Sequence, residues 1–254
     1  MGLLAEDEPP PVRVLRLDAT AVLLLTADHA GNRIPRALGD LGLPESERQR
    51  HIAWDIGIAG VTERLSALLG ATAMLQTYSR LVIDCNRAPG HPTSIPAVSE
   101  YTKIPGNAGL AAAAREARRR AIFDPYHAAI AGLLDARQAA ARRTVLVAMH
   151  SFTPVFKGVA RAVQVGVLYH HETPLSCLML ELLRAEGDIA VGANQPYAIT
   201  DDSDYTVPVH GEGRGIPHVE IEIRQDLIAD PAGQHSWAGR MARLLAEAEA
   251  RLFG

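Results

Sequence analysis

The 254-residue chain lacks the features that mark several large classes of protein. It contains only two cysteines, Cys85 and Cys177, so neither a disulfide framework nor a cysteine-only metal site is expected. No apolar run reaches the roughly 18 residues that a membrane span needs. A secretory signal is also missing, because the chain starts MGLLAEDEPPPV, without a basic region followed by an apolar stretch. We therefore expect a reduced, cytoplasmic protein.

The sequence also lacks an excess of positive charge. Its formal net charge is -4 at pH 7, and binding to nucleic acid generally depends on a basic surface. The one cluster of arginines, Arg115 and 118–120, includes Glu116 in a helical pattern, which is typical of a solvated helix face. We therefore expect no nucleic-acid or membrane partner. The sequence does not indicate the oligomeric state.

Aromatic residues are scarce at 5%, whereas the apolar share of 48% and the charged share of 21% are ordinary for a globular protein. The length allows one large domain with a substantial core, and no linker divides it. Residues 1–11 are acidic and rich in proline, so we expect a poorly ordered tail there and a single domain over residues 12–254.

Apolar runs alternate with longer Ala- and Leu-rich segments along the chain. The short runs predict strands at 21–27, 73–78, 80–85, 145–149, 162–169 and 218–223. The longer segments predict helices at 57–70, 111–143, 174–187 and 236–252. Asp124 and Pro125 are expected to divide the second helical segment in two. This alternation is typical of an α/β domain with a largely parallel or mixed sheet.

The predicted strands end on polar residues. These ends carry Asp28-His29, Asp84-Cys85-Asn86-Arg87, His150-Ser151 and Glu222-Ile223-Arg224-Gln225-Asp226. Ligands of open α/β sheets bind beyond the carboxyl ends of the strands. We therefore expect the functional site at these positions.

Two histidines at separate strand ends, His29 and His150, indicate a metal site. A catalytic zinc takes three protein ligands and a water, and imidazole is a frequent ligand. Asp55 is the leading candidate for the third ligand, because it directly precedes the helix predicted at 57–70. Asn32 and His51 are the alternatives.

A metal-dependent hydrolase needs a base, and Glu222 fits because burial in an apolar strand would raise the pKa of its carboxyl group. Glu220 lies on the same face of that strand, so burial alone does not separate the two.

Other residues suggest the substrate. Asn86 and Arg87 look like a clamp for a small acid, since guanidinium groups bind carboxylates through two hydrogen bonds. Arg214 lies in the glycine-rich loop at residues 211–215. Tyr205 lies in TDDSDYTVPVHGEGRG, a loop long enough to form a lid.

In chain order, these residues resemble the zinc carboxypeptidase pattern: a zinc His, an Asn-Arg clamp, a second zinc His, a mobile Tyr and a base in Glu-x-Arg. The chain is more closely similar to the N-formylglutamate amidohydrolase family. The motifs that carry this resemblance are DHAGNRIP, HIAWDIG, YSRLVIDCNR, IPGN, DPYH, HSFTP, DYTV and HGEGRGIPHVEIEIRQDLI.

The resemblance implies a three-layer α/β/α fold of the phosphorylase/hydrolase-like type and zinc-dependent hydrolysis of an N-acyl acidic amino acid, typically N-formyl-L-glutamate. It implies His29 and His150 as zinc ligands and Glu222 as the base. Asn86 and Arg87 would hold the α-carboxylate. Arg214 would hold the side-chain carboxylate, and Tyr205 would contact the substrate from the lid.

The chain departs from the expected patterns in two places. Asn32 occupies the position of the metal-binding Glu of the carboxypeptidase pattern, which is why Asp55 is considered. Ala162 and Val163 follow Arg161 where relatives are expected to have Pro-Trp. Two further hypotheses follow: the same zinc mechanism on another amide or peptide-like substrate, and a non-catalytic binder of acidic metabolites.

Overall fold

A seven-stranded sheet forms the centre of the computed structural model, which describes residues 2–200 and 204–254. Its strands span Val12–Leu15 (β1), Leu23–Ala27 (β2), Thr72–Gln76 (β3), Val145–Phe152 (β6), Val165–Leu168 (β9), Val191–Ala193 (β10) and His218–Arg224 (β11). They lie in the order β1-β3-β2-β6-β11-β9-β10. Only β1 against β3 and β9 against β11 pair antiparallel among these neighbours. The expected mixed, mostly parallel sheet is confirmed.

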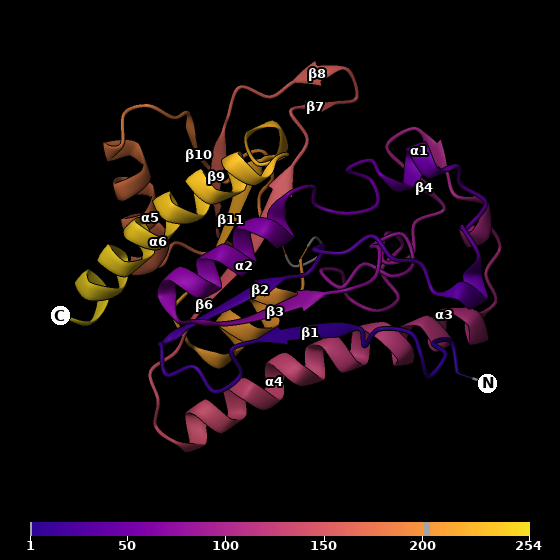
Figure 1. The fold of residues 1–254 in the computed structure, drawn as a ribbon, viewed down its shortest axis with the longest axis horizontal. Coiled ribbons are helices and arrows are strands. Elements are labelled where there is room, and N and C mark those ends of the chain that lie inside the picture. Colours follow the sequence, from indigo (N-terminus) through magenta and orange to yellow (C-terminus); the bar gives the residue numbers. More distant parts are fainter. Residues whose placement is uncertain (1, 201–203) are drawn as a thin grey trace.

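Helices cover both faces of this sheet, which confirms the three-layer α/β/α arrangement (Figure 1). The helices are Glu45–Arg48 (α1), Ile58–Leu69 (α2), Ala112–Arg118 (α3), Asp124–Ala139 (α4), Pro174–Ala185 (α5) and Pro231–Phe253 (α6). Helices α2, α5 and α6 lie on one side of the sheet, and α4 runs along the other.

Alternate residues of the central strands point into two separate cores. Leu23 and Leu25 of β2 pack with α2, α5 and α6, whereas Leu24 between them packs with Tyr126 and Ile130 of α4. Both cores are closed to water, because each of these side chains is 2% exposed or less. Such continuous apolar strands are expected where helices cover both faces.

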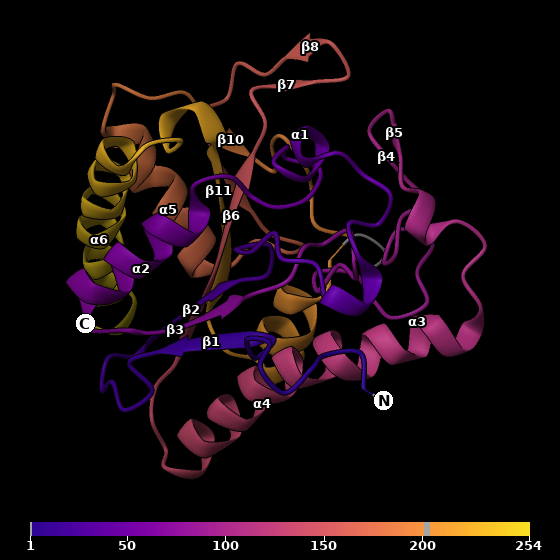
Figure 2. The ribbon, with the colours of Figure 1, turned by 45° about the vertical axis from the view of Figure 1, so that its right-hand side comes forward.

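Two small hairpins and several short helical turns complete the fold. The hairpin strands are Val98–Ser99 (β4) with Thr102–Lys103 (β5), and Val155–Phe156 (β7) with Val159–Ala160 (β8). The helical turns are Arg36–Leu38 (η1), Pro105–Asn107 (η2), Arg119–Phe123 (η3), Val207–Gly211 (η4), Glu212–Arg214 (η5) and Gln225–Leu227 (η6). In Figure 2 the β7–β8 hairpin projects beyond the sheet. The backbone N–H of Lys157 at its tip donates to Glu100 in the β4–β5 turn (3.1 Å), so the two hairpins touch.

One predicted strand is wrong, and of the predicted division at Asp124-Pro125 the start of a helix (α4) at Asp124 is confirmed while the role of Asp124 as N-cap is wrong. Residues 80–85 form buried turns, because their backbone bonds to loops: the N–H of Asp84, for example, donates to the carbonyl of Ser94 (2.7 Å). The chain also stays helical through Asp124, with φ -58 and ψ -47. A proline ring clashes with the carbonyl four residues earlier in a regular helix, and the wider π-helical turn η3 directly before Pro125 relieves this clash.

The first residues contact the body of the protein. The hydroxyl of Tyr78 donates to the carbonyl of Pro9 (2.7 Å). The N–H of Thr77 donates to the carbonyl of Pro11 (3.0 Å). The division into tail and domain stays a prediction. Within residues 2–200 and 204–254, no helix has both the length and the hydropathy to cross a membrane, and the cytoplasmic location stays a prediction.

Arg118 of α3 is buried and holds the loop that leads into the strand-end site. Its guanidinium donates to the carbonyls of Val82 (3.0 Å) and Gly106 (3.1 Å) and to Oδ1 of Asn107 (2.7 Å). Burial lowers the pKa of Arg118 to about 10. The guanidinium therefore pairs the carbonyl of Val82 and joins the turn around it to residues 106–107.

We expect Arg118→Met to lower the free energy of unfolding by about 3 kcal/mol, because it leaves several buried acceptors without a donor. Urea unfolding followed by circular dichroism measures this. Arg120→Met is the matched control, since that side chain is 72% exposed, and we expect no measurable change. Equal losses for the two variants would show that the buried hydrogen bonds do not hold the loop.

Candidate metal centre

A cavity of about 490 Å³ lies at the carboxyl ends of β2, β6 and β11. Its lining includes most of the residues that the strand-end argument selected, namely His29, Asp55, Asn86, Arg87, His150, Glu220 and Glu222. The parallel pairing of β6 with β11 places Glu222 directly beside His150. The sheet topology therefore brings together residues up to about two hundred positions apart in the sequence.

Asp55 lies between the two histidines. Its Oδ2 is 3.5 Å from Nδ1 of His29 and 3.1 Å from Nδ1 of His150. The N–H of Ser151 also donates to this oxygen (3.1 Å), and the N–H of Asp55 donates to the carbonyl of His29 (2.9 Å). The segment before α2 is thus tied to the ends of both β2 and β6.

Both imidazoles are oriented by further carboxylates behind them. Nε2 of His29 donates to Oδ1 of Asp84 (2.7 Å), and Nε2 of His150 lies 3.3 Å from Oδ2 of Asp28. The hydroxyl of Tyr126 donates to the other oxygen of Asp28 (2.6 Å). Because a carboxylate only accepts, Nε2 of His29 carries the proton that Asp84 receives, and Nδ1 of each ring faces Asp55. Carboxylates commonly orient metal-binding histidines in this way.

The three side chains fit a divalent cation. One ligand atom each from His29, Asp55 and His150 lies within 4.8 Å of the others, and all three are buried. Ligands of a tetrahedral zinc at bond lengths of 2.0–2.1 Å are separated by about 3.3 Å, and the 3.1 and 3.5 Å separations at Asp55 lie on either side of this value. This cluster could therefore hold a metal ion.

The two alternative third ligands lie elsewhere. The side-chain amide of Asn32 donates to Gln49 (3.1 Å) at the surface, and Asn32 does not line the cavity. His51 does line the cavity, but its Nε2 lies near Glu100 (3.4 Å) at the rim. Asp55 is thus the candidate that shares a site with both strand-end histidines.

The two glutamates of β11 have high pKa values. Burial raises the pKa of Glu222 to about 8 and that of Glu220 well above its usual value. Their Oε2 atoms are buried without a hydrogen-bond partner among the described residues. Oε2 of Glu220 lies 3.9 Å from Nε2 of His150, on the side of that ring that faces away from Asp55. The position of Glu222 beside His150 distinguishes it from Glu220, which lies beside Ala148.

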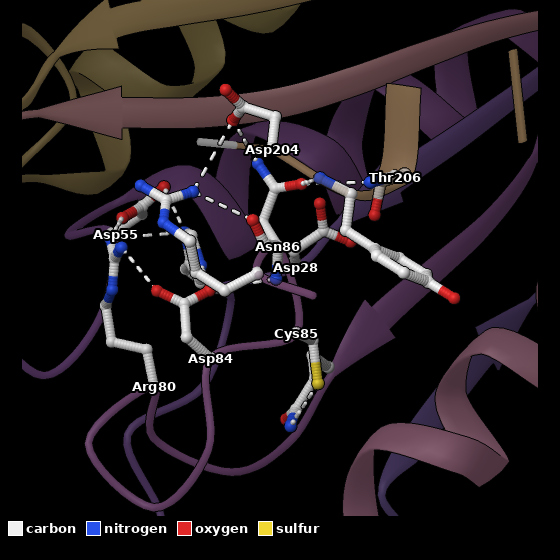
Figure 3. Close-up of polar contacts among 12 residues, drawn as sticks. Asp28, Asp55, Arg80, Asp84, Cys85, Asn86, Asp204 and Thr206 are labelled. Carbon is white, nitrogen blue, oxygen red and sulfur yellow. Dashed lines mark hydrogen bonds and ion pairs between the residues drawn. The ribbon is translucent and has the colours of Figure 1, made fainter. Parts of the chain in front are cut away.

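Arg80 is a site residue that the sequence argument missed. Its Nη2 donates to Oδ2 of Asp84 (2.6 Å), and its Nη1 lies 3.4 Å from Nδ1 of His29 and 3.7 Å from Oδ1 of Asp55 (Figure 3). The motif YSRLVIDCNR contains Arg80, but a strand over residues 80–85 would not have singled it out. The guanidinium faces the same point as the candidate metal ligands.

Asn86 and Arg87 both line the cavity but have different surroundings. The amide of Asn86 donates to Asp204 (2.8 Å) and accepts from the N–H groups of Tyr205 (2.9 Å) and Thr206 (3.0 Å). Nη1 of Arg87 donates to the carbonyl of Asn86 (2.8 Å) and lies 3.6 Å from Asp204. Asn86 therefore anchors the 204–206 segment, while Arg87 faces the cavity.

Two predicted residues lie outside the cavity lining. The ring of Tyr205 packs against Phe123 and His127, with centroids 5.0 and 4.6 Å away. The guanidinium of Arg214 donates to Asp135 of α4 (2.6 Å). The structure does not bring either side chain to the metal cluster, and their proposed roles in substrate contact stay predictions.

The predicted lid covers TDDSDYTVPVHGEGRG, residues 200–215. Residues 201–203 of this segment lie outside the described residues. The remainder forms η4 and η5, which end at Gly215 in the left-handed conformation with φ 64. The lid stays a prediction.

The fold and this cavity define a class: an α/β protein with a candidate metal centre at its strand ends. The family model for N-formylglutamate amidohydrolase matches residues 21–229. The chain belongs to this family of amidohydrolases.

Two solved structures are similar over nearly the whole chain. The gene product Atu2144 from Agrobacterium tumefaciens is 38% identical, with a TM-score of 0.95 over 99% of this chain and all of that one. An N-formylglutamate amidohydrolase from Ralstonia eutropha JMP134 is 21% identical, with a TM-score of 0.69 over 95% of this chain and 98% of that one, and shares the fold. No curated protein matches the chain.

We expect the protein to bind one divalent cation per chain through the His29, Asp55 and His150 cluster. Zinc at 100 times its Kd should raise the melting temperature by about 5–10 °C, because it binds the folded state alone. Differential scanning fluorimetry and elemental analysis measure this. Asp55→Ala should abolish the rise, whereas Asp135→Ala, a 65% exposed control, should retain it. Equal zinc binding by both variants would rule out this cluster.

Proposed function

We propose that the protein is a zinc-dependent amidohydrolase that cleaves a small N-acyl acidic amino acid. The leading substrate is N-formyl-L-glutamate, which water splits into formate and glutamate. The observation that carries this proposal is the buried His29, Asp55 and His150 cluster next to a glutamate of raised pKa. Family membership supports the amide chemistry.

The donor set favours zinc. Two imidazoles and one carboxylate are a frequent ligand set of catalytic zinc, which keeps a fourth position open. Zinc bound there would supply Lewis acidity for the attacking water and for the amide carbonyl. His29, Asp55 and His150 would hold it, with Asp84 and Asp28 orienting the two rings.

Glu222 is the proposed base. It lies beside His150 in the sheet, and its carboxyl group is within the electrostatic influence of Asp55 and Arg80. It would take a proton from water as the water oxygen bonds to the formyl carbon, and return it to the amide nitrogen as the C–N bond breaks. A carboxyl group with a pKa near neutrality can do both. The positive cluster at the metal site would favour its ionised form before the reaction.

Arg80 and Arg87 are proposed to act on the substrate itself. Arg80 faces the cluster at 3.4 Å from His29, so its charge would stabilise negative charge on the amide oxygen. Arg87 lines the cavity next to Asp204 at 3.6 Å and would bind the α-carboxylate. Asn86 would act indirectly, because its amide holds the 204–206 segment.

We expect Glu222→Gln to lower kcat for N-formyl-L-glutamate by about 10²–10⁴-fold, the usual contribution of a positioned base, with unchanged zinc content. Release of glutamate in a coupled assay measures kcat. Glu220→Gln should lower kcat much less, since Glu220 lies behind His150, and Glu116→Gln on the helix surface should leave it unchanged.

A panel of N-acyl amino acids and peptide-like amides separates the proposed substrate from its alternatives. Turnover of another amide without turnover of N-formyl-L-glutamate would reassign the substrate within the same chemistry. Zinc-loaded protein that binds glutamate but hydrolyses no member of the panel would favour the non-catalytic binder. Full activity of Glu222→Gln would remove Glu222 from the role of base.

A further inference from the structure

Arg161 stacks on three aromatic rings of the cavity wall, although Arg161 is not itself one of the lining residues. It follows β8, and its guanidinium carbon is 4.7 Å from the ring centroid of Tyr197, 4.8 Å from that of Phe156 and 5.7 Å from that of Phe152. All three rings line the cavity. The guanidinium therefore sits directly behind part of the cavity wall.

Within residues 2–200 and 204–254, no Asp or Glu forms an ion pair with Arg161. Its Nη1 donates a long hydrogen bond to the carbonyl of Thr153 (3.4 Å), and its guanidinium also hydrogen-bonds to the side chain of Tyr197. A guanidinium stacked on aromatic faces keeps N–H groups at its edge for other acceptors. By contrast, Arg87, the other arginine proposed for carboxylate binding, already lies 3.6 Å from Asp204.

The field of Arg161 reaches the groups that line the cavity. Burial lowers the pKa of His51, and the positive charge of Arg161 adds to this lowering. Burial raises the pKa of Tyr197. The negative charge of Glu222 raises this pKa further, whereas Arg161 lowers it. Tyr197 thus lies within the electrostatic influence of both Arg161 and the proposed base.

The backbone around Arg161 is fixed on both sides. Its N–H donates to the carbonyl of Pro154 (2.9 Å), across the base of the β7–β8 hairpin, and its carbonyl accepts from Nη1 of Arg224 at the end of β11 (3.0 Å). The stacked side chain and the held backbone keep the guanidinium in place before a ligand arrives. A receptor organised in this way loses little entropy on binding.

We propose that Arg161 binds the distal carboxylate of the substrate and so selects N-acyl derivatives of acidic amino acids. This inference rests on the proposed amidohydrolase function and names the residue that reads the amino-acid side chain. Arg214, which the sequence suggested for this role, is paired with Asp135 of α4, whereas Arg161 stacks on three rings that line the cavity. Arg87 would then bind the α-carboxylate of the substrate, and Arg161 would bind its distal carboxylate at another part of the cavity.

The test compares Arg161→Met, which keeps an apolar stem against the rings, with a matched control. Arg143→Met is that control, because Arg143 also stacks on an aromatic ring, 5.0 Å from the centroid of Phe253, away from the cavity lining. The substrates are N-formyl-L-glutamate and its neutral analogue N-formyl-L-glutamine. Values of kcat and KM are measured for both on zinc-loaded full-length protein.

We expect Arg161→Met to lower kcat/KM for N-formyl-L-glutamate about 10- to 100-fold, mainly through KM, since a hydrogen bond to a charged group is lost. N-formyl-L-glutamine should change less than twofold, and Arg143→Met should change neither substrate. Arg161→Glu should reverse the preference between N-formyl-L-glutamate and N-formyl-L-lysine. An equal loss on the acidic and neutral substrates, or no loss on either, would overturn the role of Arg161.

Equilibrium binding of glutarate by isothermal titration calorimetry gives a measurement that needs no turnover. The wild type should bind this dicarboxylate at least tenfold more tightly than Arg161→Met does, whereas butyrate should bind both alike. If the wild type hydrolyses no N-formyl amino acid but this binding difference is seen, the proposed function fails and the role of Arg161 is retained. If hydrolysis occurs and glutarate binds both proteins equally, only the role of Arg161 fails.

Discussion

The burial of carboxylates beside two imidazoles at the strand ends is the constraint on which the rest of the site depends. Asp28, Asp55 and Asp84 are each 3% exposed or less, and a buried carboxylate without a cationic or hydrogen-bonding partner is costly. His29 and His150 meet these carboxylates through both ring nitrogens. The arrangement therefore fixes the ring orientations, and it directs both Nδ1 atoms toward one oxygen of Asp55.

The layer on the far side of the sheet contributes to the same network. Tyr126 of α4 donates to Asp28, which lies behind His150, so a helix that covers the sheet also supports a candidate metal ligand. Arg118, at the end of α3, donates to the carbonyl of Val82 and so holds the loop that precedes Asp84. The continuous α3–η3–α4 helix thus connects core packing to the geometry of the site. A break at Asp124 would have separated these two contributions.

The sequence predicted most strands and the strand-end ligands, because apolar runs and the polar residues that follow them are local signals. Asp55 was found since it directly precedes a predicted helix. Arg80 was missed because an apolar neighbourhood made residues 80–85 look like a strand, and whether that backbone pairs in a sheet depends on distant partners. Arg161 and Arg214 show the same limit, since the direction of a long guanidinium side chain depends on neighbours far away in the sequence.

The two glutamates of β11 show how a two-residue step along one strand can separate two roles. Glu220 and Glu222 face the same side, both are buried, and both have raised pKa values. Two carboxyl groups in one low-dielectric site do not ionise independently, so a proton held by one favours ionisation of the other. Glu220 lies 3.9 Å from Nε2 of His150, the ring nitrogen that faces away from Asp55. Glu222 lies two residues nearer the carboxyl end of β11, beside His150, where Arg80 and a cation held by the candidate metal ligands would favour the ionised form that the proposed base requires.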